Sequence, residues 1–325
     1  MAQRVFLSGG AGRIGSKVLK LLLEKGFRVR ALVHRQAPRG ISSPNLELAR
    51  GDILDQGSLK EALRGCGIVC HLAAAWDMFP PAVYEKENDQ LFESVIRGTY
   101  NLLEAARGRE DLELFLYAST DAVYATGARR FEAPITEDNT ELAPSRFYAL
   151  AKIVGETMCR QYGSLYGLPW LIVRICWALD EEELLRVYSY EFWREGMSPE
   201  DRESLAPKLA GGKGLFAPLM EDGESAVDCI ADPWDIAAGI VQAVERRRSA
   251  VHGTYNLAGP GPFRYLEVIE KAARALAVPW YSARIKGIHP YELRIDRARR
   301  AFGYDPQHTM ERMLEKAARR KKGGL

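Results

Sequence analysis

The sequence predicts an α/β fold, a doubly wound parallel sheet followed by a small C-terminal lobe. Short apolar segments alternate with amphipathic segments up to residue 176, the pattern of a parallel sheet with helices on both faces. A glycine-rich turn joins the first apolar segment to the first amphipathic one. The 325 residues are 47% hydrophobic, enough for a large buried core. We expect one domain over residues 1–176 and a second over 177–325, interleaved with the sheet around 226–260.

Local periodicity predicts each element in turn. Residues 16–26 place apolar side chains on one helical face and end at a glycine. Residues 27–34 alternate apolar and polar side chains, as a half-buried strand does. Ser58 is a favourable cap for a helix. In chain order, the pattern predicts strands over 4–9, 27–34, 45–52, 67–75, 112–120 and 169–176, and helices over 16–26, 58–66, 87–107 and 147–166.

The character of the sequence changes after Trp177. Residues 180–226 are charged, aromatic and rich in glycine and proline, with weak periodicity. We expect them to form a substrate-binding cap over the carboxyl ends of the strands, where open α/β sheets bind ligands. Trp76 and Trp177 are candidate substrate contacts, because aromatic side chains suit an apolar pocket. Ordinary core packing is the alternative explanation for each of them.

Composition and charge exclude several classes of protein. The net charge of +2, from 45 basic and 43 acidic residues, argues against nucleic acid as the main partner. No apolar stretch approaches the ~20 residues that span a bilayer, and the start of the chain resembles a strand rather than a signal peptide. The five cysteines lack C-x-x-C spacing, so we expect no metal, no disulfide and a cytoplasmic location. The basic run at 319–322 is typical of a solvated helix end.

The segment SGGAGRIGS, residues 8–16, has the spacing of a turn that holds a nucleotide diphosphate. Its first glycine can form the tight turn after the strand, its second lets the backbone approach the phosphates, and its third allows the helix to pack closely on the sheet. The helix N-terminus that follows attracts an anion. The turn predicts a dinucleotide-binding site made by Gly9, Gly12, Arg13, Ile14 and Gly15.

The end of the second strand indicates which dinucleotide binds. An acidic residue there would bond the ribose 2′-hydroxyl of NAD, but the only acid in that region, Glu47, comes too late in the chain. His34 and Arg35 stand there instead, and basic side chains pair with a 2′-phosphate. We therefore predict NADP as the cofactor. NAD remains the alternative, because His34 and Arg35 can also be solvated loop residues.

Tyr148 and Lys152 are predicted to form the reacting pair. Four residues apart on a helix, they lie on one face as neighbours. A phenol with a pKa near ~10 is a poor proton donor and acceptor at neutral pH, and a fixed ammonium group nearby lowers that pKa. A tyrosine and a lysine at this spacing also arise by chance in a chain of this length, so the spacing alone identifies no catalyst.

Ser119, Thr120 and Asp121 end the strand predicted over 112–120, at the edge where the sheet is expected to open. A hydroxyl group at this edge can orient a substrate carbonyl, so the three residues are candidate substrate contacts. Simple capping of the next turn by serine or threonine is the alternative.

Six motifs occur in a fixed order along the chain. They are SGGAGRIGS, GDILD (51–55), HLAAA (71–75), RGTYNLLEAA (97–106), YASTDAVY (117–124) and YALAK (148–152). With these motifs the chain resembles the extended short-chain dehydrogenase/reductase family, the NAD(P)-dependent epimerase/dehydratase group. The resemblance continues in residues 231–245, 253–261 and 296–314, so it covers almost the whole chain apart from 180–226.

The resemblance implies a Rossmann-like NAD(P)-binding domain, an oxidoreductase, and a homodimer formed by the helices over 87–107 and 147–166. Tyr148 would be the general acid/base, Lys152 its partner and a ligand of the nicotinamide ribose, and Thr120 the catalytic hydroxyl. Further cofactor contacts are implied for Asp52 and Ile53 at the adenine, and for Leu72, Ala73 and Ala74 along the cofactor channel.

Some positions depart from the usual pattern of the family. Residues 149–151 are Ala-Leu-Ala where Gly-x-Ser is commoner. Ala122 occupies the position of the catalytic glutamate of nucleotide-sugar 4,6-dehydratases, which counts against elimination chemistry. The cap contains no clear diphosphate clamp, although Arg186, Arg194 and Lys213 are candidates for parts of one.

Three functions stay open at this point. The first is hydride transfer between nicotinamide and a small carbonyl/alcohol substrate, favoured because RVRALVHR (28–35) resembles the dihydroflavonol-reductase branch. The second is a nucleotide-sugar epimerase, which uses the same tyrosine and lysine. The third is a non-catalytic NADP-binding sensor, against which the intact Tyr148 and Lys152 pair counts.

Overall fold

A parallel sheet forms the centre of the molecule. The computed structural model describes residues 3–74 and 88–322. Within these residues the strand order is β11-β6-β5-β4-β1-β2-β3, with every neighbouring pair parallel. The order reverses at β1, so the predicted doubly wound sheet is confirmed. The strands are β1 (Arg4–Ser8), β2 (Arg28–Val33), β3 (Leu46–Arg50), β4 (Ile68–His71), β5 (Leu114–Thr120), β6 (Trp170–Ile175) and β11 (Gly253–Leu257).

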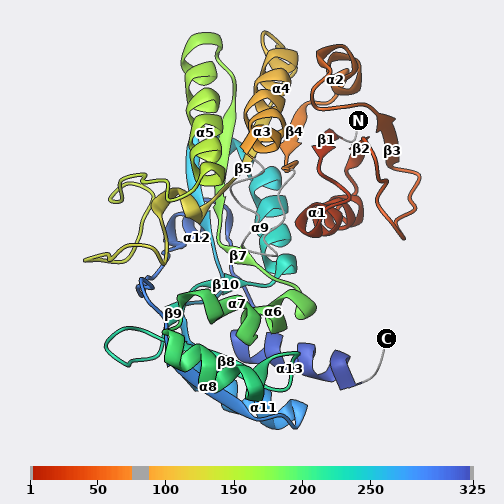
Figure 1. The fold of residues 1–325 in the computed structure, drawn as a ribbon. Helices are drawn as coiled ribbons and strands as arrows, with labels where there is room; N and C mark the ends of the chain where they lie inside the picture. Colours follow the sequence, from red (N-terminus) through yellow and green to blue (C-terminus); the bar gives the residue numbers. More distant parts are fainter. Residues whose placement is uncertain (1–2, 75–87, 323–325) are drawn as a thin grey trace.

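Helices cover both faces of this sheet (Figure 1). One face carries α1 (Arg13–Glu24), α9 (Pro233–Glu245) and α12 (Asp296–Phe302), and the other carries α2 (Gln56–Leu63), α4 (Gly98–Ala106) and α5 (Phe147–Tyr166). Alternate residues of a strand point to opposite faces. Accordingly Val5 and Leu7 pack into the core beneath α1 and α9, whereas Phe6 packs into the core beneath α2 and α4. Both faces of β1 are thus buried, as its apolar sequence predicts.

Local chemistry shifts some predicted boundaries. The side chain of Asp55 accepts a hydrogen bond from a backbone N–H in the first turn of α2, so the predicted Ser58 cap is wrong. The helix predicted over 87–107 is interrupted where described. It consists of α3 (Asn88–Leu91), a π-helical turn η2 (Phe92–Arg97) and α4.

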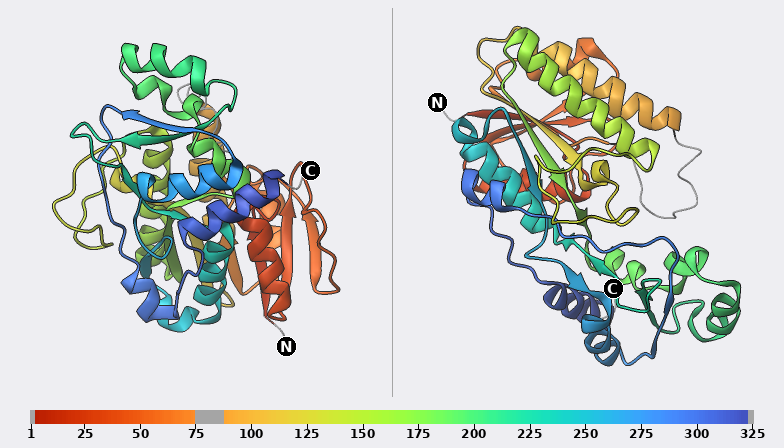
Figure 2. Two further views of the ribbon diagram at one scale, coloured as in Figure 1. Left: turned by 90° about the horizontal axis from the view of Figure 1, so that it is seen from below. Right: turned by 90° about the vertical axis from the view of Figure 1, so that its left-hand side faces the viewer.

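A second lobe is assembled from segments that are distant in sequence. In it β8 (Leu215–Leu219) pairs in parallel with β13 (Trp280–Arg284), and β9 (Val227–Asp228) pairs antiparallel to β12 (Phe263–Arg264). The right-hand view of Figure 2 shows this lobe below the sheet and its helices. The segment 180–226 is thus only part of the lobe. The helices of the lobe are α6 (Glu181–Val187), α7 (Tyr190–Trp193), η4 (Arg194–Gly196), α8 (Pro199–Leu209), α11 (Tyr265–Leu276) and α13 (Met310–Lys322).

The chain returns from the lobe to the sheet between residues 229 and 262. There β10 (Ile230–Ala231) pairs with β7 (Trp177–Ala178), and β11 extends the sheet beside β6. A short helix, α10 (Arg247–Ala250), lies between α9 and β11. This crossing places the carboxyl end of the sheet directly against the lobe.

The five cysteines are all buried and free, as expected of core residues. None of the helices in the described ranges is long and apolar enough to cross a membrane. The basic C-terminal run is partly engaged, because Arg320 forms an ion pair with Glu181 at 3.1 Å.

Candidate active site

The glycine turn forms a close-packed cradle at the start of α1. Gly9 has a left-handed φ of +77°, and a side chain there would lie 2.8 Å from the Leu72–Ala73 backbone. A Cβ on Gly15 would overlap the carbonyl oxygen of Gly9. Gly12 is more open, since an added Cβ meets only that same oxygen, at 3.2 Å. No side chain caps α1 and no acidic residue lies in its first turn, so its N-terminal N–H groups fit a phosphate.

A buried hydrogen-bond chain, which sequence reasoning missed, holds this cradle. Thr99 donates to the Val95 carbonyl, so its oxygen accepts from His71 Nε2 at 3.0 Å. His71 Nδ1 is then free to accept from the Ser8 hydroxyl at 2.9 Å, and Ser8 Oγ accepts from the Ala73 N–H. Burial lowers the pKa of His71 to about 3, which keeps the ring neutral. The chain ties the ends of β1 and β4 to α4, beneath the cradle.

The predicted adenosine contacts lie at the ends of β2 and β3. The structure brings His34 and Asp52 together, with His34 Nε2 3.3 Å from the carboxylate. Arg35 is exposed and has no ion pair within the described ranges. Ile53 packs against Gly98 and accepts a hydrogen bond from the Asn101 side chain at 3.1 Å. The same region therefore holds a guanidinium and an imidazole that suit a 2′-phosphate, and a carboxylate that opposes one.

The structure brings Tyr148, Thr120 and Lys152 together where β5 ends against α5. The phenol of Tyr148 is hydrogen-bonded to the Thr120 hydroxyl. Lys152 lies one turn further along, with its Nζ 5.8 Å from the centre of the Tyr148 ring. That ammonium donates to the Ala118 carbonyl at 2.7 Å, which leaves two of its three donors for a ligand such as a ribose. Ala74 packs in the same apolar cluster as Tyr148.

Burial dominates the protonation of this pair. It raises the pKa of Tyr148 above its ordinary value, the charge of Asp121 raises it further, and Thr120 and Arg13 lower it only in part. The Lys152 ammonium donates to the Ala118 carbonyl, and the groups that lower the pKa of Tyr148 are Thr120 and Arg13, so the expected lowering by Lys152 is not found. Burial also lowers the pKa of Lys152 to about 8, against the opposing charge of Glu156.

Ser119 and Asp121 have different surroundings, because Ser119 lies in β5 and Asp121 begins the short helix η3 (Asp121–Tyr124) after it. Ser119 is buried and donates to Glu156 at 2.6 Å, within the buried ion pair between Glu156 and Arg174. Asp121 is also buried, and its carboxyl accepts hydrogen bonds from Thr120 and Thr126 at 3.3 Å each. Burial, and then the charge of Asp228, raise the pKa of Asp121 to about 7. Asp121 is thus a neighbour of Tyr148, whereas Ser119 is part of the buried network around Glu156 and Arg174.

Arg13 connects the glycine turn to the lobe. Its guanidinium donates to the Ala178 carbonyl at 2.5 Å and pairs with Glu183 at 2.6 Å. Glu183 also completes the cap of α6, because its side chain accepts from the Asp180 N–H. Arg13 therefore holds the start of the lobe against the start of α1.

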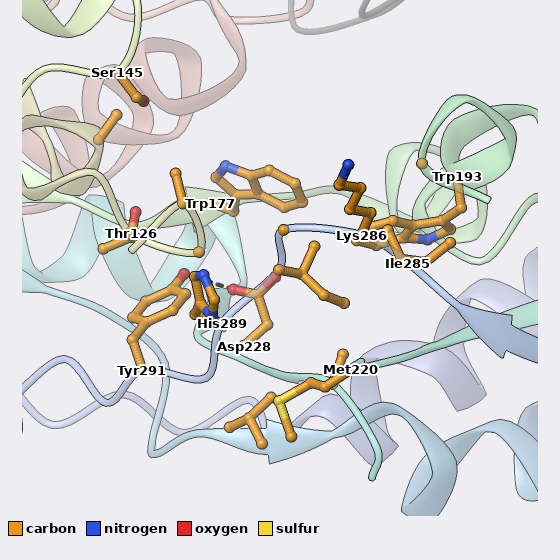
Figure 3. A pocket seen from close by; sticks show the side chains of 18 of the residues that line it. Thr126, Ser145, Trp177, Trp193, Met220, Asp228, Ile285, Lys286, His289 and Tyr291 are labelled. Carbon is orange, nitrogen blue, oxygen red and sulfur yellow. Dashed lines mark hydrogen bonds between the residues drawn. The ribbon is translucent and has the colours of Figure 1, made fainter. Parts of the chain in front are cut away.

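A cavity of about 380 Å³ separates the carboxyl end of the sheet from the lobe. Tyr148, Trp177, Asp228 and Tyr291 are among the residues that line it, and Figure 3 shows the last three. Trp177 thus occupies the pocket predicted for it, and its indole packs edge to face on Phe192 at 5.9 Å. Trp76 lies outside the described residues.

Several residues of this wall were missed by sequence reasoning. Asp228 accepts hydrogen bonds from the hydroxyls of Tyr291 at 2.5 Å and Tyr265 at 3.3 Å. Lys286 and His289 line the same cavity. No motif marks these positions, and Asp228 lies 63 residues from Tyr291 in sequence. Only the folding of the lobe brings them together.

The residues named as parts of a diphosphate clamp do not line this cavity. Arg186 pairs with Glu182 at 2.9 Å, Arg194 with Glu195 at 3.3 Å, and Lys213 donates to a backbone carbonyl. Within the described ranges, no cluster of three histidine, cysteine or acidic side chains has the arrangement of a metal site.

Known proteins resemble the chain in sequence. The sequence model of the NAD dependent epimerase/dehydratase family matches residues 5–180. L-arabinose 1-dehydrogenase (NAD(P)(+)) of Haloferax volcanii is 32% identical over 245 residues, 69% of this chain and 89% of that protein. UDP-glucose 4-epimerase of Halalkalibacterium halodurans is 26% identical over 329 residues, 96% of this chain and 94% of that protein. With three other curated relatives, the match spans between 34% and 54% of the relative's length.

The fold has a close counterpart among solved structures. A short-chain dehydrogenase/reductase superfamily protein of Agrobacterium tumefaciens, solved with bound NAD, superposes with a TM-score of 0.83 at 27% identity. The superposition covers 99% of this chain and 98% of that one. The family match over more than half of the chain, together with this shared fold, shows that the chain belongs to the NAD-dependent epimerase/dehydratase family, NAD(P)-dependent enzymes of the extended short-chain dehydrogenase/reductase type.

Proposed function

We propose that the protein is an NAD(P)-dependent dehydrogenase or reductase, which transfers a hydride between nicotinamide and a small carbonyl/alcohol substrate. The observation that carries this proposal is the position of Tyr148. Its side chain lines the cavity between sheet and lobe, bonded to Thr120 and beside Lys152. A phenol and a hydroxyl at one end of a cavity suit proton exchange with a substrate oxygen.

Each residue has a separate task in this proposal. The bound nicotinamide supplies or accepts the hydride. Tyr148 exchanges a proton at its phenol oxygen with the substrate oxygen, and Thr120 orients the same oxygen. Lys152 holds the cofactor ribose with the donors that Ala118 leaves unused. The open N-terminus of α1 holds the cofactor phosphates.

The raised pKa of Tyr148 indicates which direction of the reaction, reduction or oxidation, the resting enzyme favours. The phenol is protonated at neutral pH in the cofactor-free protein, which is the form that gives a proton to a carbonyl oxygen. Oxidation of an alcohol needs the phenolate instead. We therefore expect alcohol oxidation to speed up as the pH rises, and carbonyl reduction to run well at neutral pH.

The experiment is a comparison of three variants on a substrate found by screening free sugars, polyols and simple aldehydes for NAD(P)H absorbance change. Tyr148→Phe should keep the fold and cofactor affinity but lower turnover about 10²–10⁴-fold. Lys152→Met should lower turnover and weaken cofactor binding together. Thr120→Val should mainly lower turnover. A Tyr148→Phe enzyme with near-normal activity would refute the mechanism.

Nucleotide-sugar epimerisation is the second candidate, because the UDP-glucose 4-epimerase relative aligns along almost the whole chain. The position of the basic cap residues counts against it, since Arg186, Arg194 and Lys213 do not line the cavity. Tight binding of a uridine or thymidine diphosphate sugar would favour this candidate. A protein that binds cofactor but turns over no carbonyl or alcohol would instead favour the NADP-sensing role.

We propose two further properties of the same enzyme. NADP is its preferred cofactor, supported by His34 and Arg35 at the end of β2. The enzyme forms a homodimer through the faces of α4 and α5 that carry exposed apolar side chains.

A further inference from the structure

The Asp228 carboxyl group forms part of the cavity wall and is held by hydrogen bonds alone. Its Oδ1 accepts from the Tyr291 hydroxyl at 2.5 Å and from the Cys229 N–H at 2.7 Å, and its Oδ2 accepts from the Tyr265 hydroxyl at 3.3 Å. In residues 3–74 and 88–322, no lysine, arginine or histidine pairs with it. Two buried tyrosines from separate segments thus hold the carboxyl group in place. Figure 3 shows Tyr291 beside Asp228.

One acceptor position of this carboxyl group is left for a ligand. Each carboxylate oxygen accepts about two hydrogen bonds. Oδ1 already has two, whereas Oδ2 has only the long bond from Tyr265. Asp228 is partly buried and lines the cavity, so a donor on a substrate there can take the remaining acceptor position of Oδ2.

Asp228 is the acidic side chain of the cavity lining in the described residues. Asp121 does not line the cavity, although the charge of Asp228 raises its pKa. Arg146, Lys286 and His289 also line the cavity, but none of them pairs with Asp228. Asp228 thus keeps its acceptor capacity for a donor on the substrate.

The other side of the cavity suits a compact ring. The aromatic side chains of Trp177, Phe192 and Trp193 form a partly apolar wall. A sugar ring presents C–H groups on its faces and hydroxyl donors at its edge, so it matches an aromatic wall together with a carboxylate acceptor.

We propose that Asp228 is a specificity-determining residue of this enzyme and accepts a hydrogen bond from a hydroxyl group of a free sugar. This inference rests on the proposed function, because it concerns the substrate of the same site.

The test measures binding, so that it does not depend on turnover. Each D- and L-aldopentose and each common aldohexose is titrated into the protein–cofactor complex, and UDP-glucose and glucose 6-phosphate are titrated in parallel. Binding is followed by the fluorescence of Trp177 and Trp193, which line the cavity. We expect at least one free sugar to bind more tightly than both phosphorylated compounds.

Asp228→Asn should then weaken binding of that sugar by about 10- to 100-fold, the size expected for one hydrogen bond to a charged group. Asp222→Asn is the matched control, since it makes the same change at an exposed position outside this cavity. Cofactor affinity should be unchanged in both variants.

Deoxy sugars extend the test to the wild-type protein and complete a double-mutant cycle. The wild type should bind the deoxy sugar that lacks the hydroxyl bound by Asp228 about 10- to 100-fold more weakly than it binds the parent sugar. The wild type and Asp228→Asn should bind this deoxy sugar with equal affinity. The inference is overturned if no free sugar binds, if a phosphorylated sugar binds more tightly, or if every deoxy sugar binds like its parent. Sugar binding without turnover would refute the proposed function and leave the inference standing.

Discussion

Burial determines the protonation of the residues around Tyr148. It raises the pKa of the Asp121 and Asp228 carboxyl groups and of the phenol, and it lowers the pKa of Lys152. All of these shifts favour the uncharged form. The end of β5 is therefore a place of low polarity, which suits the proton exchange that we propose for Tyr148.

Asp121 gives the first prediction, on stability against pH. Its pKa is about 7 in the folded protein and ~3.9 in an unfolded chain, so the folded state binds more protons between these values. Its contribution to the free energy of unfolding therefore falls as the pH rises from 4 to 7. The loss is up to about 4 kcal/mol, at about 1.4 kcal/mol per pKa unit.

Urea unfolding of the wild type and of Asp121→Asn at pH 5 and pH 8 measures this effect. The variant should gain stability relative to the wild type as the pH rises. Asp222→Asn, at an exposed carboxyl, should run parallel to the wild type. An Asp121→Asn curve that also runs parallel would contradict the assigned pKa.

Arg35 gives the second prediction, on the choice of cofactor. Its exposed guanidinium at the end of β2 should pair with a 2′-phosphate, so Arg35→Ala should weaken NADPH binding about tenfold and leave NADH binding unchanged. Arg28→Ala, at the opposite end of the same strand, is the control. Titrations followed by tryptophan fluorescence give both affinities. Equal affinity of the wild type for the two cofactors would refute NADP preference.

At the scale of elements, the site is made where strand ends meet helix starts. The end of β1 turns through Gly9 into α1, and the end of β5 meets α5 at Thr120 and Tyr148. The ends of parallel strands lie at one edge of the sheet, so cofactor turn and reacting pair face the same lobe. The position of the glycine turn itself depends on its close packing against the Leu72–Ala73 backbone, directly after β4.

The glycine turn gives the third prediction. In Gly15→Ala the new Cβ overlaps the Gly9 carbonyl, so the turn must move, and stability should fall by about 1–3 kcal/mol. In Gly12→Ala the Cβ meets the Gly9 carbonyl oxygen at 3.2 Å, which a small shift relieves, so the melting temperature should change little while cofactor affinity falls at least tenfold. Thermal unfolding and cofactor titration of both variants give the answer. Normal cofactor binding by Gly12→Ala would show that the backbone at residue 12 does not approach the phosphates.

At the scale of the whole molecule, the sheet side carries an unusual apolar surface. Phe92, Tyr100, Leu150, Leu165 and Tyr166 are each more than two-fifths exposed, and all lie on η2, α4 or α5. Exposed apolar side chains gathered on neighbouring helices are typical of an interface between subunits. These helices are the ones from which the sequence predicts a homodimer.

This surface gives the fourth prediction. The wild type should have twice the monomer mass in light scattering, and Tyr100→Glu should shift it toward the monomer, because an interface buries a charge at high cost. Leu48→Glu makes a similar change on β3, where the exposed side chain lies away from α4 and α5, and should stay dimeric. A wild-type protein of monomer mass would refute the dimer.

Much of the fold and part of the site follow from local patterns. The helix predicted over 147–166 is α5 with the same ends, because its apolar face and its Gly167 stop lie close together in sequence. The glycine turn and the Tyr148–Lys152 spacing are likewise local. The geometry of a strand, a turn or a helix depends on a few residues that are close in sequence, so these elements can be predicted from the sequence.

Only the tertiary structure decided the pocket wall and the protonation of the site. Asp228, Tyr265 and Tyr291 meet because two distant segments fold into one lobe, and no local pattern encodes that meeting. The sequence alone suggested that Lys152 lowers the pKa of Tyr148, whereas the structure turns its ammonium to the Ala118 carbonyl and burial raises that pKa. Burial and charge depend on which groups are neighbours in space, and the order of residues along the chain does not give those neighbours.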